Sequence, residues 1–196
     1  MAALRSQLAD TLLPPTALDF AVGGGVMRYT NQRPPLPADL DGLRPGTGLL
    51  PSDAVSGEAA QVLIALIFIA RGALDAAHDI VGSLDSAEAT YAHAMIHRRE
   101  GASTGEAGLP GYSNSRYWFS CLGDHPLFAQ VAQFAAAQPG APRTMKSAEW
   151  QPAAFVQHCA NSEKSGSSEA LAFCAAVQQK EWELLFDWCV ELAAVA

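Results

Sequence analysis

The segment EALAFCAAVQQKEWELLFDWCVELAA, residues 169–194, decides the fold class. Its apolar residues recur at intervals of three and four, the period of an α-helix with one face turned to a core. A second apolar stripe lies beside the first, and a helix that is apolar on two sides packs against two neighbours. We therefore predict that this helix is central to a helical bundle. The first stripe comprises Leu171, Cys174, Gln178, Trp182, Leu185, Cys189 and Leu192, and the second comprises Phe173, Val177, Leu184 and Trp188.

Working outward from this helix, the chain from residue 56 onward has helical signals and no strand-like alternation longer than four residues. Glycines such as Gly72, Gly82, Gly101 and Gly123 separate the segments and are typical of helix ends. The sequence predicts an all-α protein, a single helical bundle of six or seven helices. The expected helices are 58–70, 73–81, 86–100, 113–122, 127–137, 152–160 and 169–194.

Two helix boundaries carry more specific expectations. Asp85 is followed three residues later by Glu88, a variant of the capping box that opens a helix. The polar segment NSEKSGSS at 161–168 is expected to be a linker between the last two helices.

Residues 14–53 are rich in proline and glycine, which disfavour regular structure. We expect a short helix at 4–13, then an irregular arm at 14–53 that lies across a helical core of residues 56–196, all within a single domain. The apolar residues that recur through the arm include Phe20, Val22, Met27, Tyr29, Leu36, Leu40, Leu43, Leu49 and Leu50.

The composition narrows the possible functions. The 196 residues suffice for one domain, and a formal net charge of −8 without a basic block disfavours binding to nucleic acid or anionic membranes.

The longest apolar run, VLIALIFIA at 62–70, is about half of the ~20 residues that span a bilayer, and the first residues contain no apolar run typical of a signal peptide. The four cysteines form no CxxC pair. We expect reduced thiols and a cytoplasmic protein.

A polar stripe in the predicted helix 86–100 indicates a candidate metal site. Ser86, Thr90, His93, His97 and Glu100 are spaced by 4, 3, 4 and 3 residues, which places them on one side of the helix. Two histidines and a carboxylate are the ligands of catalytic zinc and non-haem iron(II) sites. The predicted ligands for Zn²⁺ or Fe(II) are His78, His93, His97 and Glu100. His78 comes from the preceding helix and would be a fourth ligand or would donate a hydrogen bond to one of the other ligands.

Two other interpretations of this region stay open. A polar stripe opposite the apolar residues Leu84, Ala87, Tyr91, Ala94 and Met95 is also what a solvated helix face looks like. A polar site without metal would use His93, His97, Arg98, Glu100 and Arg116. GDHP at 123–126 predicts a helix stop and restart, with His125 as a cap or catalytic base.

Arg98 and Arg99 point about 100° apart on the same helix. Arg98 is at the edge of the apolar face, so we expect it to be partly buried and paired with an acid. The nearest acids by sequence are Asp75, Asp79 and Asp124. Replacing Arg99 is expected to have little effect on stability.

The motifs HRREG at 97–101, SNSRYWF at 113–119 and GDHP at 123–126, with the tail EWELLFDWC, resemble a family of uncharacterised small proteins. Its members read HRREGD, then NAxYW, then GxHP. This chain lacks the Asp after Gly101, has Ser115 in place of Ala, and carries an inserted GEAGLPG stretch. The resemblance implies a shared residue set without a known activity. That set is His78, His97, Arg98, Arg99, Glu100, Asn114, Tyr117, Trp118 and His125.

The segment ARGALDAAHDIVGSL at 70–84, with the helix that follows, resembles a helical hairpin of the tetratricopeptide kind. Only one such unit is present, whereas about three are needed for a stable array.

These observations lead to a ranked set of functions. The first expectation is a helical interaction or scaffold protein, the second a small-molecule or metal-dependent enzyme, and the third a structural subunit of a larger assembly. The candidate catalytic residues are His97, Glu100 and His125, and the candidate binding residues are Arg98, Asn114, Arg116, Tyr117 and Trp118.

Overall fold

The structure is a computed structural model that describes residues 20–23, 36, 38, 40–41, 43, 57–102 and 109–195. In these residues the elements are α-helices and one 3₁₀ turn, with no β-strand, which confirms the all-α class. The expected helix at 4–13 and most of the arm at 14–53 lie outside the described residues. The helices are α2 (Glu58–Ala70), α3 (Leu74–Val81), α4 (Ala87–Glu100), α5 (Gly111–Leu122), α6 (Phe128–Ala137), α7 (Pro152–Ser165) and α8 (Ser168–Val195), with the 3₁₀ turn η2 at Arg143–Met145.

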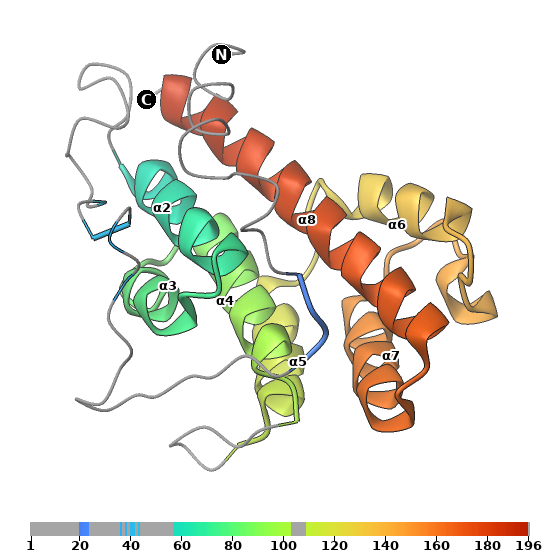
Figure 1. Ribbon diagram of the computed structural model, residues 1–196. Coiled ribbons are helices and arrows are strands. Elements are labelled where there is room, and N and C mark those ends of the chain that lie inside the picture. The colour runs from blue at the N-terminus through green and yellow to red at the C-terminus, as the bar shows by residue number, and fades with distance from the viewer. Residues whose placement is uncertain are drawn as a thin grey trace.

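The long helix α8 crosses the molecule (Figure 1). Helix α2 lies beside its C-terminal half, whereas α6 and α7 flank its N-terminal half (Figure 1). Helix α4 packs between α2, α3 and α5 and also contacts α8. The expectation that the last helix packs against more than one neighbour is confirmed. Its first stripe ends earlier than predicted, because Leu192 is exposed.

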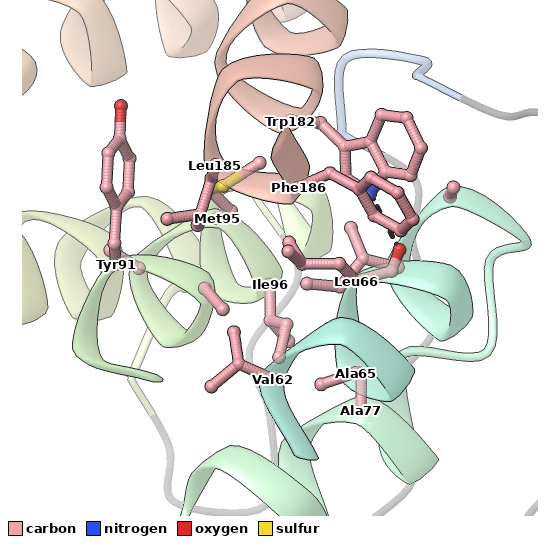
Figure 2. Close-up of a cluster of buried hydrophobic side chains, with 14 of the residues drawn as sticks. Val62, Ala65, Leu66, Ala77, Tyr91, Met95, Ile96, Trp182, Leu185 and Phe186 are labelled. Atoms are coloured by element: carbon pink, nitrogen blue, oxygen red, sulfur yellow. Dashed lines mark hydrogen bonds between the residues drawn. The ribbon is translucent and has the colours of Figure 1, made fainter. Parts of the chain in front are cut away.

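The core forms where α2, α4 and α8 meet. In Figure 2, Trp182 and Phe186 of α8 lie next to Leu66 of α2, and Met95 and Ile96 approach from α4. The Trp182 indole N–H donates to the Leu66 carbonyl at 2.7 Å, so the one polar atom of this large side chain is satisfied inside the core. Every residue from Val62 to Ala70 is buried, which confirms that the apolar run is a core helix.

The described arm residues pack on this core, as expected. Leu40 and Leu43 are buried within it, and Phe20, Val22 and Leu36 pack against it. Three of the four cysteines are buried free thiols and Cys121 is exposed. In the part of the chain that the structure describes, no helix is both long and apolar enough to cross a membrane.

Helix α4 begins with a different cap from the one predicted. Ser86 is the N-cap, and its hydroxyl accepts the Ala89 N–H at 3.3 Å. The Ser86 N–H donates at 2.9 Å to Glu58 of α2, which takes the part expected of Glu88. Glu88 instead accepts the indole N–H of Trp188. A carboxylate from a neighbouring helix thus completes the cap. A capping-box pattern covers only four consecutive residues, so it cannot predict a partner that is 28 residues away in the sequence.

Two other helices are longer than predicted. Helix α7 runs to Ser165 rather than 160, because the hydroxyls of Ser162 and Ser165 donate back to carbonyls one turn earlier and so fit within a helix. Gly166, with φ of 65°, ends it. Helix α5 begins at Gly111 instead of 113, where the chain passes so close to α4 that a Cβ atom would lie 2.5 Å from the His97 carbonyl oxygen.

Candidate metal centre

Three histidines converge between α3 and α4. His93 and His97 are one turn apart on α4, and His78 faces them from α3. One ring nitrogen of each lies within 4.8 Å of the other two. The His93 and His97 rings are stacked with centroids 4.9 Å apart, and the His78 ring stands edge-on to both. We call His78, His93 and His97 the histidine cluster.

The cluster is not on a solvated helix face, so that interpretation of the stripe is wrong. His93, His97 and Glu100 are each less than 5% exposed: 4%, 1% and 2%. The physical reason is that other helices pack on both sides of α4. His78 of α3 and Trp118 of α5 contact the histidine side, whereas Tyr91 on the other side packs on α5, α6 and α8. A helix enclosed on all sides buries its polar stripe as well as its apolar one.

Glu100 contacts His97 and is not one of the three residues whose ligand atoms converge. Its carboxylate lies 3.0 Å from His97 Nδ1, so a proton on Nδ1 is donated to Glu100 and the lone pair is left on Nε2. The Asn114 amide of α5 lies 3.0 Å from that Nε2 and can donate to it. The carboxylate therefore selects the tautomer and ring orientation of His97, the arrangement found behind many metal-bound histidines.

His93 is held neutral by its surroundings. Burial, together with the neighbouring His78 and His97, lowers the pKa of His93 to about 3. Burial and the adjacent His97 also lower the pKa of His78. The Trp118 ring of α5 stacks on His93 at a centroid distance of 3.8 Å. His93 Nε2 is buried and has no hydrogen-bond partner, which is costly for a polar atom.

This arrangement fits a transition-metal ion. Neutral imidazole nitrogens bind zinc and iron without first losing a proton, and His93 offers an unused one. At Zn–N distances of about 2.0–2.1 Å, nitrogens around one ion lie about 3.3 Å apart, so the rings would rotate inward and Asn114 would release His97 Nε2. Glu100 would then act through His97, and the candidate ligands are three histidines instead of two histidines and a carboxylate.

The arginines that follow His97 serve a different face of α4. Arg98 is paired with an acid, as expected, but it is fully rather than partly buried. The acid is Glu181 of α8, at 2.5 Å, rather than Asp75, Asp79 or Asp124. Gln178 accepts from Arg98 Nε at 3.1 Å, and Phe155 lies under the guanidinium at 4.8 Å. Arg99 is also buried, contrary to the expectation of a tolerant position, and donates to the Ile69 carbonyl.

The other candidate residues divide between the cluster and more distant places. Asn114 and Trp118 are brought to the cluster. Arg116 instead donates to Gln157 of α7 and to Ser113, and Tyr117 is 59% exposed. His125 is buried on the opposite side of α4, against Tyr91 and Phe128. The structure does not bring Arg98, Arg116, Tyr117 or His125 to the histidine cluster.

Sequence reasoning missed the partners of Arg98. Glu181 is fully buried and also accepts the Tyr91 hydroxyl at 2.9 Å, and Gln178 donates to the Phe20 carbonyl. A signal for Glu181 was present, since it lies three residues after Gln178 on the apolar side of the last helix. A charged residue in an apolar stripe is evidence for a buried ion pair.

Comparisons with known proteins identify no relative: no family model, no curated protein and no solved structure matches this chain. The resemblance to uncharacterised small proteins therefore stays a prediction, and the functional argument depends on the geometry above.

Proposed function

We propose that this protein is a metal-dependent enzyme whose ion is held by His78, His93 and His97. The observation that carries the proposal is the convergence of three imidazole nitrogens within 4.8 Å in the interior of a helical bundle. Two further observations support it. His93 Nε2 has no hydrogen-bond partner and so is available to bind an ion, and Glu100 accepts a hydrogen bond from His97, as carboxylates commonly do from metal-bound histidines.

The ligand set indicates the chemistry. Three neutral histidines leave the full charge of Zn²⁺ or Fe(II) on the ion and leave at least one coordination position open. Water in that position becomes acidic enough to supply hydroxide near neutral pH, so the reaction class best matched to the site is attack of water on an electrophilic carbon or phosphorus centre. Glu100 would keep His97 in its binding tautomer, and Trp118 would fix the plane of His93.

Metal analysis of the purified full chain tests the proposal. We expect close to one zinc or iron per chain, loss of that metal in His97→Ala and in His93→Ala, and a higher melting temperature on reloading. Glu100→Gln is expected to weaken metal affinity about 10- to 100-fold, the usual effect of removing an outer carboxylate.

His158→Ala is the matched control, because His158 is also a partly buried histidine with an unpartnered Nε2 but lies on α7 outside the cluster. It should keep its metal. A wild-type chain that contains no metal and shows no thermal shift with added Zn²⁺ or Fe²⁺ would refute the proposal.

The expectation of an interaction or scaffold protein receives less support from the described surface. The large hydrophobic side chains that are well exposed there are Leu109, Tyr117 and Leu192. One precedes α5, one is on α5 and one is on α8, so they form no apolar stripe along any one helix. That function is the one to pursue if metal analysis is negative.

A further inference from the structure

One side of α5 carries three side chains in a row beside the histidine cluster. Asn114, Tyr117 and Trp118 are spaced as i, i+3 and i+4, so they lie on one stripe of the helix. Asn114 Nδ2 lies 3.0 Å from His97 Nε2, and the Trp118 ring stacks on the His93 ring. Tyr117 does not reach the cluster but stands edge-on to Trp118, with ring centroids 5.5 Å apart. We call Asn114, Tyr117 and Trp118 the α5 stripe.

The exposure of these side chains shows from which side the cluster can be reached. The two histidines of α4 are buried, whereas His78 of α3 keeps part of its surface exposed. Along the α5 stripe, Asn114 and Trp118 are partly exposed and Tyr117 is well exposed. A molecule that comes from solvent would therefore reach the cluster between His78 and the α5 stripe, and would touch these side chains.

Asn114 contributes a hydrogen-bond donor to this approach. Its amide nitrogen lies against His97, 3.0 Å from Nε2 and 3.3 Å from Nδ1. An ion on His97 Nε2 would take that place, and the amide N–H would then be available to a neighbouring oxygen atom. An amide N–H close to a metal ion is a suitable donor for the oxygen of a carbonyl group that reacts there.

Tyr117 and Trp118 contribute an aromatic surface. Tyr117 is the most exposed large hydrophobic side chain in the described part of the chain. Its ring plane is 76° from that of Trp118, so the two rings form a corner. Aromatic groups prefer stacked or edge-on aromatic neighbours, and a corner of two rings offers both. Because Trp118 contacts His93 directly, a group in this corner would lie one ring away from the bound ion.

The charges near the cluster argue against a phosphate substrate. Sites that transfer phosphoryl groups commonly add arginine or lysine side chains to the metal ion. Besides burial, the groups that act on the pKa of His93 are the other two histidines, and no arginine or lysine is among them. Arg116, the basic residue of α5, donates to Gln157 of α7 and to Ser113. An uncharged carbon electrophile fits these surroundings better than a phosphate ester does.

We propose that the α5 stripe recognises an uncharged carbonyl compound with an aromatic group beside the carbonyl, such as an aromatic amide or ester. The Asn114 N–H donates to the carbonyl oxygen, and the aromatic group packs against Tyr117 and Trp118. In hydrolysis of such a compound, the oxygen of water bonds to the carbonyl carbon, the bond to the amine or alcohol breaks, and the leaving group takes a proton from water. This inference rests on the function proposed above and narrows its target to a carbonyl carbon.

Titration of the purified full chain without metal tests the aromatic contact separately. In a ¹⁵N-labelled sample, benzamide should shift the Trp118 indole signal in nuclear magnetic resonance spectra, and acetamide at the same concentration should shift it less. The Trp182 indole should keep its position, because that side chain is buried and donates to the Leu66 carbonyl. Tyr117→Ala should reduce the shift that benzamide causes.

The zinc-loaded full chain tests the complete site with hydroxamates, which bind zinc through a carbonyl oxygen. By calorimetry, benzohydroxamate should bind about tenfold more tightly than acetohydroxamate, the gain from one aromatic contact. Tyr117→Ala should remove most of that preference, and Tyr117→Phe should restore it. Asn114→Ala should weaken both hydroxamates about three- to tenfold and leave the preference unchanged. Leu192→Ala, which removes an exposed apolar side chain from α8, is the matched control and should change neither affinity.

The outcomes separate this inference from the proposed function. A chain that binds no zinc would refute the metal-dependent function, and the benzamide titration, which needs no metal, would still decide the aromatic contact. An unchanged Trp118 signal with benzamide, or a full aromatic preference in Tyr117→Ala, would overturn the assignment of the α5 stripe. Tighter binding of phenylphosphonate than of benzohydroxamate to the zinc-loaded chain would overturn the choice of a carbonyl substrate.

Discussion

At the scale of single residues, His93 is the side chain whose chemistry depends most on its position. It lies between the Trp118 and His97 rings, faces His78, and has an unpartnered Nε2. No carboxylate contributes to its titration, whereas carboxylates act on His78. A protonated imidazole in this place has no counter-charge, and a metal ion would be the cation that the three lone pairs can share.

This environment makes stability depend on pH in a definite direction. The pKa of His93 is about 3 in the folded chain, against 6.5 in an unfolded one. Between these values the unfolded chain binds the extra proton, so stability is complete above pH 6.5 and falls as the pH decreases towards 3. Each pH unit below 6.5 should cost about 1.4 kcal/mol from this residue.

Urea denaturation in the presence of a chelator, at a series of pH values, checks this. On acidification below pH 6.5, the free energy of unfolding of His93→Gln should decrease less steeply than that of the wild type, by about 1.4 kcal/mol per pH unit. Residual pH dependence is expected in the variant, because burial also lowers the pKa of His78, His125 and His158. Parallel curves for wild type and variant would contradict the assignment of a suppressed proton to His93.

The candidate site could be predicted from the sequence in part. The helical period correctly placed His93, His97 and Glu100 on one side of α4, because that depends only on local geometry. Whether that side faces water depends on α3 and α5, which come from other parts of the chain, and no local pattern contains their positions. The hydrogen bond between Glu100 and His97 Nδ1, which makes Glu100 a partner of His97 and not a candidate ligand, was likewise seen only in the folded structure.

At the scale of helices, the buried pair between Arg98 and Glu181 connects α4 to α8. Both side chains are almost completely buried. Gln178 accepts from Arg98 Nε, and the Tyr91 hydroxyl donates to Glu181. Breaking such a pair leaves a charge without a partner in the interior, whereas replacing both members with neutral groups removes that penalty. The pair is thus expected to specify how α4 and α8 pack, more than to stabilise them.

We predict that Arg98→Met lowers the free energy of unfolding by about 3–5 kcal/mol. The double variant Arg98→Met with Glu181→Gln should recover a large part of that loss, because the stranded carboxylate is gone. Lys180→Met is the control: its pair with Glu183 is about one-third exposed and should contribute less than about 1 kcal/mol. Additive effects of the two changes in a double-mutant cycle would show that the pair is not coupled.

Helix ends illustrate how far sequence patterns reach. Gly101 and Gly123 were correctly predicted as helix ends, because a positive φ is a local requirement that glycine meets. The start of α5 was misplaced by two residues, because Gly111 is required by the closeness of the His97 carbonyl and not by a turn. Tertiary contact, in this case between α4 and α5, sets that boundary.

At the scale of the whole molecule, α8 holds the two halves of the described chain together. Its C-terminal half packs on α2 and its N-terminal half on α6 and α7 (Figure 1). Composition and periodicity were enough to predict the all-α class and the multiple neighbours of this helix. Composition and periodicity do not identify which helices those neighbours are, because many arrangements of seven amphipathic helices bury the same apolar stripes.

Trp182 is the residue through which that architecture can be tested. It stacks on Phe186, contacts Phe20 of the arm, and donates its indole N–H to Leu66 of α2 (Figure 2). Trp182→Ala should lower the free energy of unfolding by about 3–5 kcal/mol, because it creates a large cavity and removes the indole hydrogen bond to Leu66. A domain of ordinary stability would then be close to unfolding at room temperature.

Trp182→Phe separates the two contributions, since it keeps most of the packing and removes only the donor. Its cost should be about 1–3 kcal/mol, from the loss of one buried hydrogen bond together with a small cavity. Both variants are measured by urea denaturation, with Trp188→Phe as the comparison because Trp188 is less buried and bonds to Glu88. A loss below about 1 kcal/mol for Trp182→Ala would mean that this part of α8 is peripheral, since truncating a packed core tryptophan typically costs about 3–5 kcal/mol.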